Sequence, residues 1–150
     1  MVIGHLSQGN CFKTDSFIFN MKTSRKRIGT DAERELCHIF MSHNYRVIRC
    51  AGSGTLNNSD CDLIVANKKK NYCVEVKSTR KGGVYIPKDR VKELIIFAED
   101  TNFEPVMALR FLREKWIFIH PNQLKDSGST LSITLKRAKE EGKIFEEYFK

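Results

Sequence analysis

Two short apolar runs joined by a polar turn decide the fold, and they make up the stretch 62-DLIVANKKKNYCVEVKS-78. Residues 62–66 and 72–78 carry most of the apolar side chains, while residues 67–71 are all Asn or Lys. Apolar runs of this length, bounded by a polar turn, predict two adjacent strands that pair in antiparallel fashion.

The second run alternates charged and apolar residues. Successive side chains of a strand point to opposite faces, so Glu75 and Lys77 share one face and Val74 and Val76 share the other. Asp62 opens the first run, thirteen residues before Glu75. Two carboxylates on neighbouring strands repel each other, and a divalent cation such as Mg²⁺ relieves that repulsion. A lysine beside them can position or deprotonate a water and stabilise charge on a phosphate, so the pattern favours phosphodiester hydrolysis.

A simpler interpretation of these three residues stays open. Glu75 and Lys77 are then the solvent-facing residues of an amphipathic strand, and Asp62 is a loop residue before it. The spacing D-x(12)-E-x-K is a weak signal by itself, because charged proteins match it by chance.

The rest of the chain predicts an α/β fold with a central mixed β-sheet flanked by helices. An apolar stripe at Ala32, Leu36, Ile39 and Phe40 predicts a first helix. We expect helices at residues 30–44, 88–100 and 136–150, and strands at 45–50, 62–66, 72–78, 104–112, 115–120 and 131–135. Their order is that of a mixed sheet with helices packed against it.

Composition indicates one domain and a polyanionic partner. The formal net charge is +8, spread over several segments, which suits nucleic acid; a basic protein with a solvated surface is the alternative. Residues 1–21 lack periodicity and are predicted to be a disordered extension, or an artefact of start-site choice with Met21 as the true start. Residues 22–150 are predicted to form a single nuclease domain.

The cysteines indicate a reducing compartment. Their number is odd and none lies in a C-x-x-C pair, so we expect a cytoplasmic protein without a disulfide framework or zinc module. No apolar run is long enough to span a bilayer, and we expect no membrane partner. The five are Cys11, Cys37, Cys50, Cys61 and Cys73.

Further polar residues surround the three already named. Glu33 lies next to the apolar stripe of the first helix and can lean toward the charged face of the sheet, and Arg34 follows it. Arg49 ends the strand before the glycine-containing loop, in which Ser53 can approach a phosphate backbone. Each of these alone is more simply a surface ion pair or a loop filler.

Together, four motifs resemble those of archaeal Holliday junction resolvases, which belong to the PD-(D/E)xK, or restriction-endonuclease-like, nuclease superfamily. The motifs are GTDAEREL at 29–36, RCAGSG at 49–54, DLIVA at 62–66 and VEVK at 74–77. The similarity runs from about Lys22 to His120 with the motif order retained. Two departures are a long loop between Ser53 and Asp62, with Asp60 as a competing carboxylate, and Cys61 where the superfamily motif has proline.

The resemblance implies roles for individual residues. Glu33, Asp62 and Glu75 would hold Mg²⁺, with Mn²⁺ able to substitute, and Lys77 would be the catalytic lysine. Ser53 would lie near the scissile strand. The basic residues expected to contact DNA, together with Ser53, are Arg34, Arg49, Arg80 and Lys81.

The second predicted helix suggests self-association. Ile96 and Phe97 project away from the stripe formed by Val91, Leu94, Ile95 and Ala98. Either they line a subunit interface, or another part of the same chain covers them. A four-way junction has near two-fold symmetry, and the resolvase family that the chain resembles is dimeric. Both points favour the interpretation that Ile96 and Phe97 line a subunit interface.

These observations predict a homodimeric, Mg²⁺-dependent endonuclease that resolves four-way DNA junctions by paired nicks during recombination and repair. The alternatives are a related nuclease acting on other DNA and a DNA-binding module without catalysis.

Overall fold

A five-stranded mixed sheet forms the centre of the molecule. The computed structural model describes residues 25–50 and 60–150, so residues 1–24 and the loop 51–59, with Ser53 and the predicted extension, lie outside the described residues. The strand order is β1-β2-β3-β5-β6, with β3 and β5 parallel and all other neighbours antiparallel. The strands are β1 (Arg46–Arg49), β2 (Leu63–Ala66), β3 (Asn71–Thr79), β5 (Glu104–Phe111) and β6 (Trp116–Ile119).

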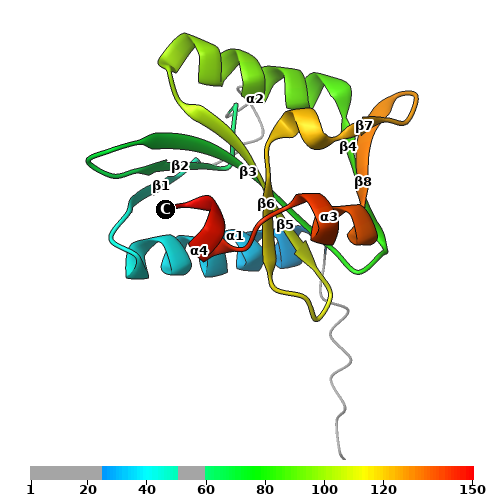
Figure 1. Cartoon of the computed structure of the whole chain (residues 1–150), viewed down its shortest axis with the longest axis horizontal. Helices are drawn as coiled ribbons and strands as arrows, with labels where there is room; N and C mark the ends of the chain where they lie inside the picture. The colour runs from blue at the N-terminus through cyan, green and yellow to red at the C-terminus, as the bar shows by residue number, and fades with distance from the viewer. Residues whose placement is uncertain (1–24, 51–59) are drawn as a thin grey trace, which may run out of the picture.

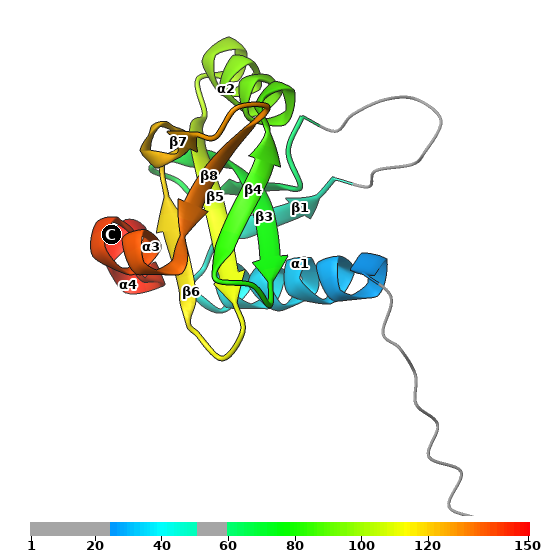
Figure 2. The same cartoon turned by 90° about the vertical axis from the view of Figure 1, so that its right-hand side faces the viewer.

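Helices α1 (Arg25–Ser42) and α2 (Lys88–Thr101) cover opposite sides of this sheet, as Figures 1 and 2 show. On the α1 side, Leu36 and Phe40 pack with Val74, Val76 and the aromatic rings of the C-terminal segment. On the α2 side, Cys73, Met107 and Leu109 face the other helix and a second sheet. The expected α/β architecture is thereby confirmed, and β3 is buried on both faces.

The first helix begins earlier than expected, at Arg25 rather than Thr30, and it has no acidic residue in its first turn. Asp31 instead lies further along, with its carboxylate 3.9 Å from both the Arg27 and the Arg34 guanidinium. Helix α2 matches its prediction closely and ends at Thr101. Asn102 caps it, and its left-handed backbone (φ 57°) accompanies a bond from the N–H of the cap back to the last turn.

A second, three-stranded sheet was not expected. Its order is β4-β8-β7, from β4 (Gly83–Pro87), β8 (Thr130–Thr134) and β7 (Lys125–Asp126), and only the β8 region was predicted as a strand. Val84 and Ile86 of β4 point into the core on the α2 side, whereas Tyr85 between them is exposed. A short 3-10 helix, η1 (Pro121–Gln123), joins β6 to this sheet.

The prediction of one C-terminal helix is wrong. Two short helices, α3 (Leu135–Glu141) and α4 (Phe145–Tyr148), are separated by residues 142–144. A side chain at Gly142 would collide with Ile117 and the Ala138 carbonyl oxygen, and Lys143 instead bonds through its backbone to Phe118 of β6. The interruption turns α4 toward α1, where Phe145 contributes to the aromatic cluster.

Candidate active site

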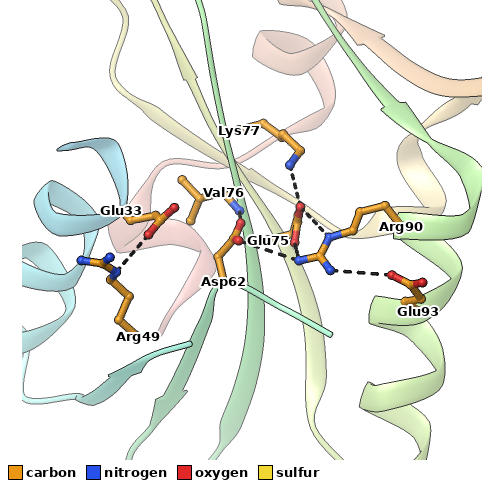
Figure 3. Close-up of polar contacts among 8 residues, drawn as sticks. All are labelled: Glu33, Arg49, Asp62, Glu75, Val76, Lys77, Arg90 and Glu93. Atoms are coloured by element: carbon orange, nitrogen blue, oxygen red, sulfur yellow. Dashed lines mark hydrogen bonds and ion pairs between the residues drawn. The ribbon is translucent and has the colours of Figure 1, made fainter. Parts of the chain in front are cut away.

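Asp62 and Glu75 meet where β2 and β3 lie side by side, because Leu63 of β2 is in register with Val74 of β3. Asp62 immediately precedes β2, and its Oδ2 accepts a hydrogen bond of 2.7 Å from the N–H of Val76. This bond fixes the Asp62 carboxylate beside the strand that carries Glu75. The two carboxylates and their neighbours are drawn in Figure 3.

Glu75 is the one charged residue in the buried core of the described chain, with only 1% of its surface exposed. It lies on the face that Cys73 and Met107 share, under α2, so this face is covered rather than open as its charges suggested. A buried carboxylate is stable as an anion only when it is paired and hydrogen-bonded. The partners are Lys77, whose Nζ lies 2.6 Å from Oε1, and Arg90.

Arg90 of α2 holds Glu75 with two hydrogen bonds. Its Nε donates to Oε1 at 3.1 Å and its Nη2 donates to Oε2 at 2.8 Å. Nη2 is also 3.8 Å from Oδ1 of Asp62, and Nη1 is 3.7 Å from Oε2 of Glu93, one helical turn further along α2. The guanidinium therefore contacts both carboxylates of the site (Figure 3).

Arg90 was not among the site residues predicted from the sequence. Its position, directly before Val91 and four residues before Leu94, lies at the flank of the buried stripe of α2. The available signal was a cation at the flank of an apolar helical stripe. Which strand the helix covers could not be known without the tertiary structure.

Glu33 approaches this site from the opposite side of the sheet. It belongs to α1, which packs against the face of Val74 and Val76, and its Oε2 lies 3.1 Å from Nε of Arg49 in β1. Its charge nevertheless acts on Asp62. The structure thus brings Glu33 and Arg49 together as a pair next to Asp62, Glu75 and Lys77, as Figure 3 shows.

Burial and neighbouring carboxylates both raise the pKa of Asp62. Burial, followed by the negative charges of Glu75 and Glu33, raises the pKa of the Asp62 carboxyl to about 6, although the Val76 N–H and the Lys77 ammonium act in the opposite direction. A further positive charge beside Asp62 would lower that pKa.

The other predicted residues lie around this centre. Arg34 is largely exposed on α1, next to Glu33, and Arg80 and Lys81 are exposed just beyond the end of β3. Cys61, where the superfamily motif has proline, is buried on the α2 side of the core. Of the expected interface residues Ile96 is exposed, whereas Phe97 partly packs against its own chain, with its ring 6.0 Å from that of Phe103.

The donor set fits a hard divalent cation in its chemistry. Asp62 and Glu75 present carboxylate oxygens side by side, and burial together with the charge of Glu75 raises the pKa of Asp62, so a bound cation would be favourable there. The site is not a finished cage, since no group of three or more His, Cys, Asp or Glu side chains within residues 25–50 and 60–150 is arranged to hold a metal ion. The Glu75 carboxylate instead forms ion pairs with Arg90 and Lys77.

Other features of the described chain bear on its class. Cys37, Cys50, Cys61 and Cys73 are free thiols. None of the helices within residues 25–50 and 60–150 has the length and apolar character needed to cross a membrane.

Comparison with known proteins agrees with this geometry. The family model described as archaeal Holliday junction resolvase (hjc) matches residues 24–150. A crossover junction endodeoxyribonuclease Hjc of Archaeoglobus fulgidus is 30% identical over 131 residues, which cover 83% of this chain and 96% of that protein. The Hjc of Methanocaldococcus jannaschii is 34% identical over 107 residues, 71% of this chain and 76% of that protein.

A solved structure gives the same result for the fold. The Archaeoglobus fulgidus Hjc, a Holliday junction resolvase from an archaeal hyperthermophile, superposes with a TM-score of 0.73 at 26% sequence identity, covering 79% of this chain and 98% of that one. The fold is therefore restriction-endonuclease-like, as the motifs predicted. With a family model spanning residues 24–150, the chain belongs to the archaeal Holliday junction resolvase (Hjc) family of endonucleases.

Proposed function

We propose that this chain is a divalent-cation-dependent endonuclease that cleaves four-way DNA junctions by paired nicks during recombination and repair. The observation that carries the proposal is the convergence of Asp62, Glu75 and Lys77 where the start of β2 lies beside the middle of β3, with a pKa of about 6 for Asp62. The names of the relatives in Archaeoglobus and Methanocaldococcus supply the substrate.

Asp62 and Glu75 would hold the cation, with Glu33 as a third carboxylate nearby. Mg²⁺, for which Mn²⁺ can substitute, is the ion that such oxygen ligands favour. When bound, it supplies Lewis-acid stabilisation of a phosphate and lowers the pKa of a water. The Val76 N–H fixes the orientation of Asp62 through the bond to Oδ2.

Lys77 would act on the phosphate. Its ammonium carries three N–H bonds, one of which is directed to Oε1 of Glu75, and a third of its side chain is exposed. That exposure leaves the ammonium accessible to a non-bridging phosphate oxygen or to the attacking water. The bond to Glu75 would hold the ammonium beside the proposed metal ligands.

Basic residues around the site would bind the DNA backbone. Arg34, Arg49, Arg80 and Lys81 all expose their charged side chains, and such contacts give salt-dependent affinity without reading sequence. Ser53, in the loop outside the described residues, is proposed to contact the scissile strand. These contacts alone would also serve a binding module, so only cleavage separates the two functions.

The active form would be a homodimer, because paired nicks in a near-symmetric junction require two sites. Ile96 is 45% exposed on α2, which supports its place in an interface. The pattern of cysteines supports the cytoplasm as the location.

The test is a cleavage assay on a synthetic four-way junction and a linear duplex of matched sequence, each with and without Mg²⁺. We expect metal-dependent nicking that favours the junction. Asp62→Asn, Glu75→Gln and Lys77→Ala should lose cleavage by at least about a hundredfold while junction binding persists. Glu99→Gln, an exposed carboxylate of α2, is the matched control and should keep full activity.

Each alternative function has its own signature. Equal cleavage of both substrates would indicate a related nuclease acting on other DNA. Binding without cleavage under all metal conditions would indicate an inactive binding module.

A further inference from the structure

Arg90 contacts the atoms that a divalent cation would need. We infer that its guanidinium is an internal counter-ion, which occupies the Glu75 carboxylate in the metal-free protein and which the cation must displace. The inference deepens the proposed function, since it rests on Asp62 and Glu75 being the metal ligands.

The buried Glu75 carboxylate requires positively charged partners. With 1% of its surface exposed, Glu75 cannot keep its charge through hydration by water. Arg90 matches both of its oxygens, at 3.1 and 2.8 Å, and Lys77 adds a contact of 2.6 Å to Oε1. A planar guanidinium that engages both oxygens is a strong and geometrically specific partner. The metal-free site is thereby kept folded.

The Arg90 guanidinium and a bound cation would need the same carboxylate oxygens. Mg²⁺ and Mn²⁺ bind carboxylate oxygens directly in a nearly octahedral shell, so they need Glu75 and Asp62 turned toward one point. Nη2 of Arg90 already lies between them, 2.8 Å from Oε2 of Glu75 and 3.8 Å from Oδ1 of Asp62. A divalent cation at the same carboxylates would also be repelled by the guanidinium charge. The two therefore compete.

The displaced Arg90 side chain has an alternative carboxylate partner in Glu93. Glu93 lies one turn along α2, with Oε2 3.7 Å from Nη1 of Arg90, and about a third of its side chain is exposed. A rotation of the Arg90 side chain toward Glu93 frees Glu75 while the arginine keeps a carboxylate partner. Glu93 thus favours the arrangement in which Glu75 is free to bind the cation.

The test measures metal affinity in protein free of DNA, by calorimetric titration with Mn²⁺ alone. Arg90→Gln should bind Mn²⁺ roughly tenfold more tightly than the parent protein, since a competing charge is removed. Arg90→Lys keeps the charge without the two-bond geometry and should fall between them. Glu93→Gln removes the alternative partner and should weaken Mn²⁺ binding, by roughly twofold to fivefold.

A merely structural role for Arg90 gives a different pattern, because loosening Glu75 would leave Mn²⁺ affinity unchanged or lower it. That result for Arg90→Gln, or a Glu93→Gln affinity equal to that of the parent, would overturn the inference. If circular dichroism shows that Arg90→Gln is unfolded, then Arg90→Lys and Glu93→Gln decide by the opposite signs expected of them.

Asp62→Asn separates this inference from the proposed metal site. It should abolish the Mn²⁺ titration in both the parent and the Arg90→Gln background. Persistence of binding in Asp62→Asn would refute the metal site itself, and the inference with it. Loss of binding in Asp62→Asn together with unchanged affinity in Arg90→Gln would refute the inference alone.

Discussion

Asp62→Asn should make the metal-free protein more stable while destroying its activity. The folded protein raises the pKa of Asp62 from its ordinary 3.8 to about 6, because of burial and then the charges of Glu75 and Glu33. Above that pH the protein carries an ionised carboxylate that is more favourable in the unfolded chain than in the folded one. The difference of roughly two pH units corresponds to at most about 3 kcal/mol at 1.36 kcal/mol per unit.

The pH window follows from the sign of the shift. The stabilising effect of a raised pKa is fully present below about pH 4 and is lost as the pH rises through about 6. Asparagine is neutral throughout and can still accept the hydrogen bond from the Val76 N–H. We therefore expect Asp62→Asn to melt several degrees above the parent at pH 7.5 in EDTA, and to lose this advantage by pH 4.

Thermal melts across this pH range measure the effect, with Asp100→Asn, an exposed residue at the end of α2, as the matched control. Addition of Mn²⁺ should raise the melting temperature of the parent but not that of Asp62→Asn, because a ligand stabilises only the form that binds it. A variant that melts below the parent at pH 7.5 without metal would show that burial and the neighbouring carboxylates do not make the ionised Asp62 carboxylate unfavourable in the folded protein.

The remaining predictions concern the edges of the domain. Gly142→Ala should lower stability by about 1–3 kcal/mol in a denaturant titration, because its Cβ would collide with Ile117; no change would mean that the α3–α4 junction shifts freely. Deletion of residues 1–20 should leave melting temperature and junction cleavage unchanged, and loss of either would show that the segment packs on the domain. Charged substitutions of both Ile96 and Phe97 should give a monomer in sedimentation, and a junction-bearing plasmid should then yield nicked rather than linear product. A variant that stays dimeric and still linearises the plasmid would show that the interface lies elsewhere.

Elements with a strong local pattern were predictable from the sequence. The stripe of α2 carries its period over many residues, β3 stands out as a mainly apolar run that contains Glu75 and Lys77, and the chemistry of residues 62–78 is local in sequence. Strand β4 is different because it has five residues, begins with Gly83 and ends with Pro87, and its partner β8 lies more than forty residues away. The burial of β4 depends on that distant partner, and no local periodicity predicts the strand.

The residues of the site also differ in how well the sequence predicts them. Asp62, Glu75 and Lys77 are joined by a β-hairpin, so their proximity follows from the pairing of two adjacent strands. Arg90 reaches Glu75 only because α2 crosses the sheet at that point. The packing of a helix on a sheet is set by all the side chains between them, and a single sequence does not specify it.

The burial of β3 on both faces has a consequence for how the enzyme responds to heat. A central strand with neighbours on each side and a core on each face offers no route for local opening, so its amide hydrogens should exchange with solvent only when the whole domain unfolds. Glu75 and Lys77 therefore sit in the most slowly exchanging part of the protein. Cleavage activity and global structure should fade at the same temperature, and adaptation to hotter or cooler habitats must act on the whole domain rather than on a separately mobile catalytic lobe.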